Sequence, residues 1–479
     1  MVLKVYNTLT REMEDFVPLQ GKKINMYVCG PTVYDHCHLG HARSYISFDV
    51  IRRYLIYRGY NVNYISNITD VDDKVIYRAK EIGEDPFALS AKFTGSFIED
   101  MDTLSVLPPD SRPKVTEHIP QIIEAVESLI QNGTAYVTHK GNVYYDLTRS
   151  GEKIGVLSHQ TPEGLLEGSG SRVDVENDKR YQLDFALWKV APEGEAAWDS
   201  PWGRGRPGWH IECTVMSMKY GSQQLDIHGG GMDLIFPHHE AEIHQSESCT
   251  GKHPFSKYWM HNGFLTIDQE KMSKSLGNFF TIKEVLKKFP AGTIRFFITY
   301  THYRSTVDFN EEALEEAGRA RRRLLNTISN VRHELSEAPE DGNDCGLLDL
   351  IEQTRNAFIR AMDDDFNTRE AIGELFVFSR KVNSIMTDEK PGKTSLENAL
   401  DFYSEINEVL GIFEDNKSAA PEENICELSE DDILEMIKIR DKARDNKDWK
   451  KADAIRDELR EKGIVLEDGK MGVRWRREN

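Results

Sequence analysis

Several features that define other classes of protein are scarce in this sequence or missing from it. It has no run of about 18 apolar residues, so it predicts no membrane span. Six unevenly spaced cysteines in 479 residues argue against a disulfide framework, and favour reduced thiols or a bound metal in the cytoplasm. Neither a Walker A run nor a GxGxxG motif occurs, and the triplet Gly229–Gly231 lacks the following Lys and Ser/Thr. Phosphate binding by a P-loop or dinucleotide fold is therefore unsupported.

Positive charge is also scarce, except at one end of the chain. The net charge is −20, which argues against nucleic-acid binding by the molecule as a whole. Residues 438–479 nevertheless carry 14 Lys/Arg against 10 Asp/Glu, a net charge of +4, so the other 437 residues carry −24. From composition alone this tail is either a solvated helical face or a surface that meets a polyanion.

Apolar runs that alternate with helical patterns predict an α/β fold. Polar, ligand-like residues follow several of the strands, which is typical of a doubly wound, Rossmann-like parallel sheet with a site at the strand ends. We expect a turn at Gly229–Gly231 and a helix from Pro237 to about Cys249. Residues 151–180, rich in Gly, Ser and charge, predict a mobile edge, and a hairpin is expected around residues 140–142.

The pattern divides the chain into seven regions. A helical bundle and a small α+β C-terminal domain are expected after the Rossmann-like sheet domain. The expected regions are 1–107, first half of the sheet domain; 108–200, an insertion; 201–262, the second half; 263–309, a loop-bearing region; 310–413, the bundle; 414–427, a linker; and 428–479, the basic domain.

The first chemical signal is His38-Leu-Gly-His41, here called the histidine turn, where a strand gives way to a helix. A helix N-terminus favours phosphate, and two imidazoles one helical turn apart can donate to phosphate oxygens. Gly40 leaves room for a base or ribose to approach the backbone. Alone, the pattern is weak, since two histidines near a turn are usually surface or core residues.

The second signal is Lys271-Met-Ser-Lys-Ser275, here called the lysine loop. Two ammonium groups in a glycine-flanked loop can neutralise the charge that develops on departing pyrophosphate. A solvated basic loop would be the preferred interpretation for a Lys-x-x-Lys found alone.

The third signal is a set of thiols, an imidazole and a carboxylate. A credible zinc set consists of Cys29, Cys213, His238 and Glu242, and it leaves His38 available for phosphate. His238 and Glu242 can hold the same ion because they are four residues apart on one helix. His239 is an alternative to His238 that should lie about 60° away from Glu242. A competing set would combine four residues of the turn itself: Cys29, His36, Cys37 and His38.

Taken together, these motifs resemble those of the class I aminoacyl-tRNA synthetases, and among them the cysteinyl-tRNA synthetase family. The resemblance covers nearly the whole chain. It rests on the histidine turn, the lysine loop, the zinc set and these further stretches: residues 29–35, 67–74, 208–213, 226–231, 236–240 and 474–477.

The resemblance implies ATP-dependent attachment of L-cysteine to the 3′ end of its tRNA through a cysteinyl-adenylate. It implies that the zinc set holds one Zn²⁺, which binds the substrate thiolate and so separates cysteine from serine. Four protein ligands usually mean a closed site, so the substrate must enter as a fifth ligand or displace one.

The resemblance also implies roles for individual residues. His38, His41, Lys271 and Lys274 are the expected catalytic residues, and Mg²⁺ is expected to accompany ATP. The expected binding residues are Thr32, His38, Gly40, His41 and Lys274 for ATP, and Gly30, Thr69, Trp209 and His228 for cysteine. Those for tRNA are Lys442, Arg444, Lys450, Lys451, Trp475 and Arg476; the alternative for Trp475 is that it closes the core of the small domain.

The expected partners are thus ATP, L-cysteine and tRNA(Cys), with no membrane, and we expect a monomer. Three alternatives stay open. One is a ligase that joins cysteine to an amino sugar, which would need no basic tail. The others are a non-catalytic zinc-stabilised RNA-binding protein, and a synthetase for another amino acid, which would leave the thiols unexplained.

Overall fold

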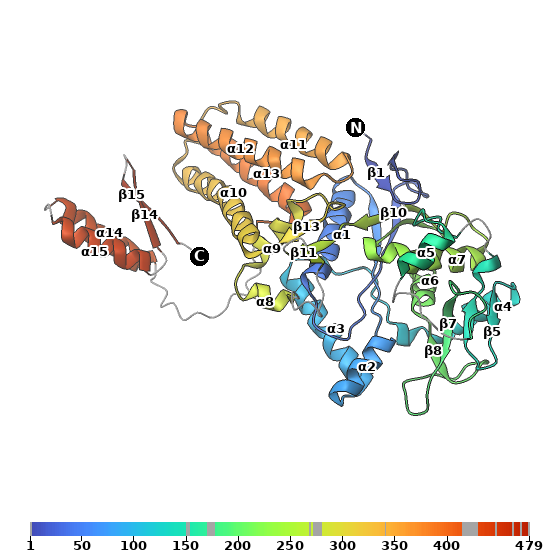
Figure 1. The fold of residues 1–479 in the computed structure, drawn as a ribbon. Coiled ribbons are helices and arrows are strands. Elements are labelled where there is room, and N and C mark those ends of the chain that lie inside the picture. The colour runs from blue at the N-terminus through green and yellow to red at the C-terminus, as the bar shows by residue number, and fades with distance from the viewer. Residues whose placement is uncertain are drawn as a thin grey trace. The chain divides into compact units, whose positions relative to one another are not determined.

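The computed structural model places the chain in two compact units, residues 1–419 (the large unit) and 420–479 (the C-terminal unit) (Figure 1). The described residues are 2–149, 154–169, 178–267, 270–271, 280–340, 342–413, 430–445, 448–461, 464–469 and 472–477. None of the described helices has the length and apolar character needed to cross a bilayer.

The large unit is built on a parallel sheet of four strands in the order β10-β9-β3-β4. The strands are β3 (Lys23–Val28), β4 (Asn61–Ile65), β9 (Leu225–Gly231) and β10 (Ser256–Asn262). Met26 of β3 lies opposite Tyr64 of β4 on one side and Ile227 of β9 on the other. Two strands from early in the chain thus pair with two from much later, which confirms the doubly wound prediction.

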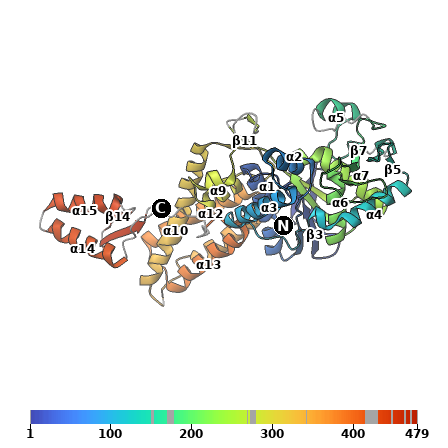
Figure 2. The ribbon, with the colours of Figure 1, turned by 90° about the horizontal axis from the view of Figure 1, so that it is seen from below.

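Both faces of the sheet are buried, because successive side chains of a strand point to opposite faces. Met26 and Val28 pack with α1 (Leu39–Tyr57) and the helical bundle, whereas Tyr27 and Cys29 pack with α6 (Trp209–Tyr220) and α7 (Glu240–Thr250). Figure 2 shows β3 between α1 and α6. Cys29 is therefore delivered to the α6–α7 side directly after the last residue of β3.

A second sheet lies between the two halves of the first in the sequence. It is antiparallel, with β5 (Ala135–Val137), β6 (Val143–Tyr145), β7 (Phe185–Val190) and β8 (Gly205–Pro207) in sequential order. β5 and β6 confirm the predicted hairpin. Of the expected mobile edge, residues 151–153 and 170–177 lie outside the described residues, and α5 (Pro162–Ser169) is a helix that the sequence did not predict.

Smaller elements complete the surroundings of the sheet. A hairpin at the N-terminus pairs β1 (Lys4–Asn7) with β2 (Glu12–Asp15), and β11 (Leu265–Ile267) lies between β12 (Glu270–Lys271) and β13 (Val307–Phe309). The remaining helices of this part are α2 (Asp73–Ile82), α3 (Pro86–Thr103), α4 (Ile119–Gln131), α8 (Ile282–Leu286) and α9 (Ala291–Thr299).

The predicted helical bundle follows. It contains α10 (Glu311–Glu337), α11 (Leu347–Asp363), α12 (Thr368–Asp388) and α13 (Lys393–Leu410), whose apolar faces share one core with α1 and the sheet. The turn between α11 and α12 is fixed to the catalytic part, because Asp365 accepts hydrogen bonds from Tyr303 Oη and Arg304 Nε at 2.9 and 2.5 Å.

The C-terminal unit has a small core of its own. Helices α14 (Glu430–Asp445) and α15 (Trp449–Glu461) pack together, and β14 (Ile464–Gly469) pairs with β15 (Gly472–Arg477) in an antiparallel hairpin. Its buried core residues are Ile433, Ile437, Leu459 and Ile464. This is the α+β arrangement that the sequence predicted.

One local prediction near the strand ends is wrong, and another is confirmed with an irregular start. Gly229–Gly231 belong to β9 and form no turn, because neighbours fill the space of a side chain: a Cβ on Gly229 would lie 2.4 Å from the Phe48 ring. The helix expected from Pro237 is present, but it starts with an irregular, π-helical turn over Ile235–His239, in which Phe236 has extended backbone angles, and the regular α-helix begins at Glu240. This turn decides where two histidines point.

Candidate active site and metal centre

The histidine turn caps helix α1. His38 is the N-cap residue, and its Nδ1 accepts a hydrogen bond from Gly40 N at 3.0 Å. His41 Nδ1 in turn accepts from His38 N at 3.2 Å, and the two imidazole rings lie 3.9 Å apart between centroids. The two side chains thus satisfy backbone donors at the start of α1 that would otherwise lack partners.

These two bonds determine which ring nitrogen carries the proton. A backbone N–H can only donate, so Nδ1 of each histidine is the acceptor, and a neutral ring must carry its proton on Nε2. Burial lowers the pKa of His41 well below its usual value, with further contributions from His38 and Lys74. His41, and His38 while neutral, therefore present Nε2–H groups at a helix N-terminus, a suitable arrangement for phosphate oxygens.

The lysine loop lies mostly outside the described residues. Lys274 is among the undescribed residues 272–279, and only the backbone of Lys271 is described, at the end of β12. The chain returns from the loop directly to the histidine turn: Leu39 N donates to Phe280 O at 3.2 Å, and Ile282 N donates to Cys37 O at 2.9 Å. The segment after the loop is thus hydrogen-bonded to the segment that carries His38.

The predicted zinc residues come together from three elements, and we call them the metal cluster. Cys29 follows β3, Cys213 lies on α6, and His238 and Glu242 come from the irregular turn and α7. Their ligand atoms all lie within 4.8 Å of one another, and all four side chains are buried.

The spacing of these atoms fits one metal ion. Ligands at about 2.3 Å from a tetrahedral ion lie about 3.8 Å apart, and ligands at about 2.0 Å lie about 3.3 Å apart. Cys29 Sγ is 3.9 Å from Cys213 Sγ and 3.6 Å from Glu242 Oε1, and His238 Nε2 is 3.1 Å from Glu242 Oε1. Two thiols, an imidazole and a carboxylate form a donor set suited to Zn²⁺.

The surroundings of the cluster prepare it for a cation. Burial lowers the pKa of His238 and of His210 to about 3, so both rings are neutral near pH 7. His210 Nδ1 lies 2.9 Å from His238 Nδ1, which orients His238 to present Nε2 to an ion. Burial also raises the pKa of the Cys29 thiol well above its usual value, with Cys213 and Glu242 adding to the effect. A bound cation would oppose this by stabilising the thiolate.

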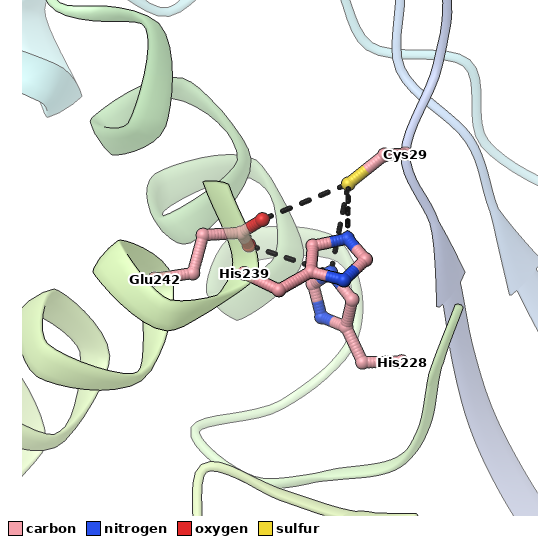
Figure 3. A group of neighbouring side chains, drawn as sticks. All are labelled: Cys29, His228, His239 and Glu242. Carbon is pink, nitrogen blue, oxygen red and sulfur yellow. Dashed lines mark hydrogen bonds and ion pairs between the residues drawn. The ribbon is translucent and has the colours of Figure 1, made fainter. Parts of the chain in front are cut away.

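A second group of possible ligands shares Cys29 and Glu242 with the metal cluster (Figure 3). His239 Nε2 lies 3.3 Å and His228 Nε2 3.6 Å from Cys29 Sγ. On a regular helix, His239 would point about 60° away from Glu242. The irregular turn before α7 breaks this regular spacing, so the His239 ring can reach Cys29. His239 Nδ1 also contacts His261 Nε2 at 2.8 Å, and His228 stacks on Trp259.

The competing set of turn residues is not assembled. Within the described ranges, only the two groups above have ligand atoms spaced for a metal. His36 Nδ1 lies 2.9 Å from Ser96 Oγ, and His38 Nδ1 caps α1, so neither is directed at Cys29.

The three parts of the chain match known family models. Residues 15–319 match the tRNA synthetases class I (C) catalytic domain, residues 357–414 the DALR domain, and residues 430–476 the cysteinyl-tRNA ligase anticodon binding domain. The chain is 48% identical to the cysteine–tRNA ligase of Pelotomaculum thermopropionicum over 99% of this chain and 100% of the relative. It is also 48% identical to that of Thermococcus onnurineus, over 100% of this chain and 99% of the relative. The chain belongs to the cysteinyl-tRNA synthetase family.

Solved structures of other class I synthetases share the fold of this family member. Methionyl-tRNA synthetase of Mycobacterium tuberculosis in complex with methionyl-adenylate aligns with a TM-score of 0.60 at 15% identity, over 81% of this chain and 89% of that one. A LeuRS–tRNA–LeuAMS complex from Agrobacterium radiobacter aligns with a TM-score of 0.63 at 11% identity, over 83% and 85%. The chain therefore has the class I aminoacyl-tRNA synthetase fold.

Of the residues that the sequence assigned to cysteine, Gly30 follows Cys29, Trp209 begins α6 and His228 lies within β9. Gly30 N donates to Asn67 Oδ1 at 2.7 Å, and a Cβ on Gly30 would collide with the backbone of Asn67. Trp209 stacks on His238 with ring centroids 4.4 Å apart. Thr32, assigned to ATP, pairs with Thr69 as two neighbouring extended residues, so those two predicted sites adjoin.

The residues assigned to tRNA lie in the C-terminal unit. Lys442, Lys450 and Lys451 are exposed and Arg444 is half-buried. Trp475 and Arg476 belong to β15, but their side chains lie outside what the structure describes.

Sequence reasoning missed Trp449 and placed His239 behind His238. Trp449 has 59% of its surface exposed, beside Lys450 and Lys451, and the Trp-Lys-Lys sequence was the available signal. His239 was discounted on helix geometry. Glu240, two residues before Glu242, is not directed at the metal cluster: its carboxylate accepts hydrogen bonds from three backbone N–H groups, of Val156, Leu157 and Ser158. No sequence signal revealed that partner.

Proposed function

We propose that the protein attaches L-cysteine to the 3′-terminal ribose of its tRNA in two steps, through a cysteinyl-adenylate. One observation carries the proposal. The thirteen residues from Cys29 to His41, directly after β3, contain one thiol of the metal cluster and two imidazoles that can donate hydrogen bonds. The thiol is that of Cys29, and the imidazoles are those of His38 and His41. A site for a thiol-bearing amino acid thus adjoins a site for a nucleotide phosphate.

In the first step, the carboxylate of cysteine attacks the α-phosphorus of ATP, and pyrophosphate leaves with Mg²⁺. The Nε2–H groups of His38 and His41 would donate to phosphate oxygens as charge develops there. Lys274, aided by Lys271, would neutralise the departing pyrophosphate, and the return of the chain from the lysine loop to Leu39 supports this role. Gly40 would let the nucleotide approach the start of α1, with Thr32 beside it.

Selection of cysteine would depend on the metal cluster. Cys29, Cys213, His238 and Glu242 would hold one Zn²⁺, and His210 would orient His238. When bound there, the ion supplies a soft Lewis acid that prefers the thiolate of cysteine to the hydroxyl of serine. Gly30, Thr69, Trp209 and His228 would enclose the rest of the amino acid.

In the second step, a ribose hydroxyl of the tRNA attacks the cysteinyl carbonyl and AMP leaves. The C-terminal unit would bind the anticodon, because its cationic residues offer phosphate contacts and aromatic rings can stack on unpaired bases. Exposed Trp449, next to Lys450 and Lys451, joins Trp475 as a candidate for stacking. We also propose that the division into seven regions reflects these tasks, that the enzyme is a monomer, and that it works in the cytoplasm.

Amino-acid-dependent exchange of pyrophosphate into ATP tests the proposal. With each amino acid in turn, we expect exchange with cysteine alone, followed by transfer to tRNA and not to an amino sugar. Lys274→Ala should slow the exchange about 10²- to 10³-fold. Exchange with another amino acid, transfer to the sugar, or no exchange would each overturn the proposal, and undiminished exchange by Lys274→Ala would overturn the role of the lysine loop.

A truncation separates the two steps. A chain that ends near residue 415 should retain cysteine-dependent exchange but charge tRNA poorly, because the large unit has its own core. Equal charging by the truncated chain would contradict the role given to the C-terminal unit.

A further inference from the structure

Tyr27 carries a buried hydroxyl group beside the metal cluster. It lies in β3 two residues before Cys29, so both side chains point to the same face of the sheet and pack with α6 and α7. Its exposed fraction is 0%, and its Oη has no hydrogen-bond partner in the part of the chain that the structure describes. A buried hydroxyl without a hydrogen bond costs free energy, so its presence here calls for an explanation.

The groups around this hydroxyl are those of the metal cluster. Burial raises the pKa of Tyr27 well above its usual value, with further contributions from Cys213, Cys29 and Glu242. Cys213 acts through hydrogen bonding as well as through charge, so its sulfur lies within reach of the hydroxyl, although the two groups are not aligned as a hydrogen bond. A phenol, with a usual pKa of about 10, keeps its proton near neutral pH and can donate it to an acceptor.

Cys213 offers a good acceptor only as a metal ligand. A thiol sulfur accepts hydrogen bonds weakly, and the contacts of Cys213 Sγ are long: 3.9 Å to Cys29 Sγ and 3.8 Å to Asn67 Oδ1. A cysteine that coordinates a metal is a thiolate, and hydrogen bonds to ionised acceptors are roughly twice as strong as those between neutral groups. Metal binding would therefore give the Tyr27 hydroxyl the acceptor that it lacks.

Asn67, the other polar neighbour named here, cannot donate to this thiolate from the atom that faces it. Gly30 N can only donate, and its acceptor at 2.7 Å is Asn67 Oδ1. The Asn67 atom that lies 3.8 Å from Cys213 Sγ is thus an oxygen and carries no proton. Tyr27 supplies a donor where Asn67 does not.

We propose that Tyr27 is a positioning residue whose hydroxyl donates a hydrogen bond to the sulfur of Cys213 when Cys213 holds the metal. The inference rests on the proposed function and deepens it, because it assigns an outer contact to a second ligand of the metal cluster, as His210 provides one for His238. The hydroxyl then favours the zinc-loaded protein and costs stability in the zinc-free protein.

Tyr27→Phe tests the inference, since it removes the hydroxyl and keeps the ring. Zinc affinity, measured by competition with a chelator, should fall about 10- to 100-fold, as is typical for loss of an outer contact. The zinc-free variant should be as stable in urea as the wild type or more stable, because it no longer buries an unsatisfied hydroxyl.

Tyr403→Phe is the matched control. Tyr403 is also buried, but its hydroxyl has a partner, Ser379 Oγ, at 2.7 Å in the helical bundle. This variant should raise the unfolding equilibrium constant about 5- to 30-fold and leave zinc affinity unchanged, the opposite of the result for Tyr27→Phe.

Cobalt reports on the sulfur directly. Co²⁺ bound by thiolates absorbs through charge transfer from sulfur, and a hydrogen bond lowers the energy of the sulfur electrons. The absorption band should therefore move to longer wavelength in Tyr27→Phe and stay in place in Tyr403→Phe. Unchanged zinc affinity, an unmoved band, or a zinc-free Tyr27→Phe destabilised as much as Tyr403→Phe would each overturn the inference. Failure of the proposed function would appear separately, as a wild type without bound zinc or without cysteine-dependent exchange.

Discussion

The two ends of the segment between β3 and α1 are built in different ways. At its start, Cys29 needs partners from α6 and α7, almost 200 residues further along the chain, and the four ligands of the metal cluster are all buried. At its end, His38 and His41 are half-buried and cap one helix with bonds that span no more than three residues. The proposed metal side is therefore a product of tertiary packing, whereas the proposed phosphate side is encoded locally.

The largest effect is expected when one of the distant residues of the metal cluster is replaced. Cys213→Ser should lose bound zinc and cysteine-dependent pyrophosphate exchange together, with a larger effect than the about 10- to 100-fold typical of an outer contact. Metal analysis and exchange assays on the purified protein measure both. Cys249→Ser is the matched control, because Cys249 lies on α7 but belongs to neither ligand group. Stoichiometric zinc in Cys213→Ser would refute the metal cluster.

The next effect should be confined to the phosphate side. His41→Asn should reduce the rate of exchange about 10²- to 10³-fold, because it removes one donor to the reacting phosphate. Zinc content and cysteine affinity should stay at wild-type levels, since the two sides do not share His41. His36→Asn in the same segment is the control, and a similar loss there would argue against a specific role for the histidine turn.

A smaller effect sharpens the metal side. His210→Asn removes the group that faces His238 Nδ1 and should weaken zinc binding about 10- to 100-fold while leaving four ligands in place. Competition with a chelator measures the affinity. His253→Asn alters an exposed histidine and should change nothing. If both variants bind zinc equally well, His210 does not orient the ligand.

The smallest effect is one of pH. Burial lowers the pKa of His210, His238 and His261 to about 3, below the value of about 6.5 in an unfolded chain. Their contribution to stability is complete above about pH 6.5 and is lost as the pH falls towards 3, because the unfolded state then binds more protons. In the zinc-free protein, each of these three histidines should raise the equilibrium constant for unfolding about tenfold for every unit by which the pH falls in this range.

Urea titrations between pH 6.5 and 5 measure this dependence. His261→Gln should reduce it by one proton. An unaltered slope in His261→Gln would mean that His261 is not held neutral by burial.

The same contrast explains what the sequence could predict. The position of the histidine turn between a strand and a helix was predicted correctly, because the three elements follow one another in the chain. Local hydrophobic patterns and turn residues are sufficient to indicate such an order. The metal cluster was predicted from residue chemistry and a resemblance, since no pattern reports which distant elements meet. Glu240 and Glu212 show what local patterns cannot predict. Glu240 accepts hydrogen bonds from the backbone of residues 156–158, and Glu212 accepts one from Thr69; no local sequence pattern indicates either contact.

One prediction failed where packing overrode a local pattern. Three consecutive glycines indicated a turn, but in β9 they admit Phe48 and His239 against the strand. Pro237 indicated the start of a helix, and the helix is present, but its first turn, Ile235–His239, is π-helical. With that turn, His238 and His239 both belong to ligand groups that contain Cys29.

The order of strands in the central sheet also bears on how the enzyme forms during its own synthesis. β3 and β4 are translated early, but the other neighbour of β3 is β9, where Met26 meets Ile227. At about 5 to 20 residues per second, a ribosome needs roughly 10 to 40 seconds to add the intervening 200 residues. Throughout that time one edge of β3 has no strand beside it, and Cys29 has neither Cys213 nor Glu242. The nascent chain can cap α1 early, but the four residues of the metal cluster can meet only after α6, β9 and α7 have been made.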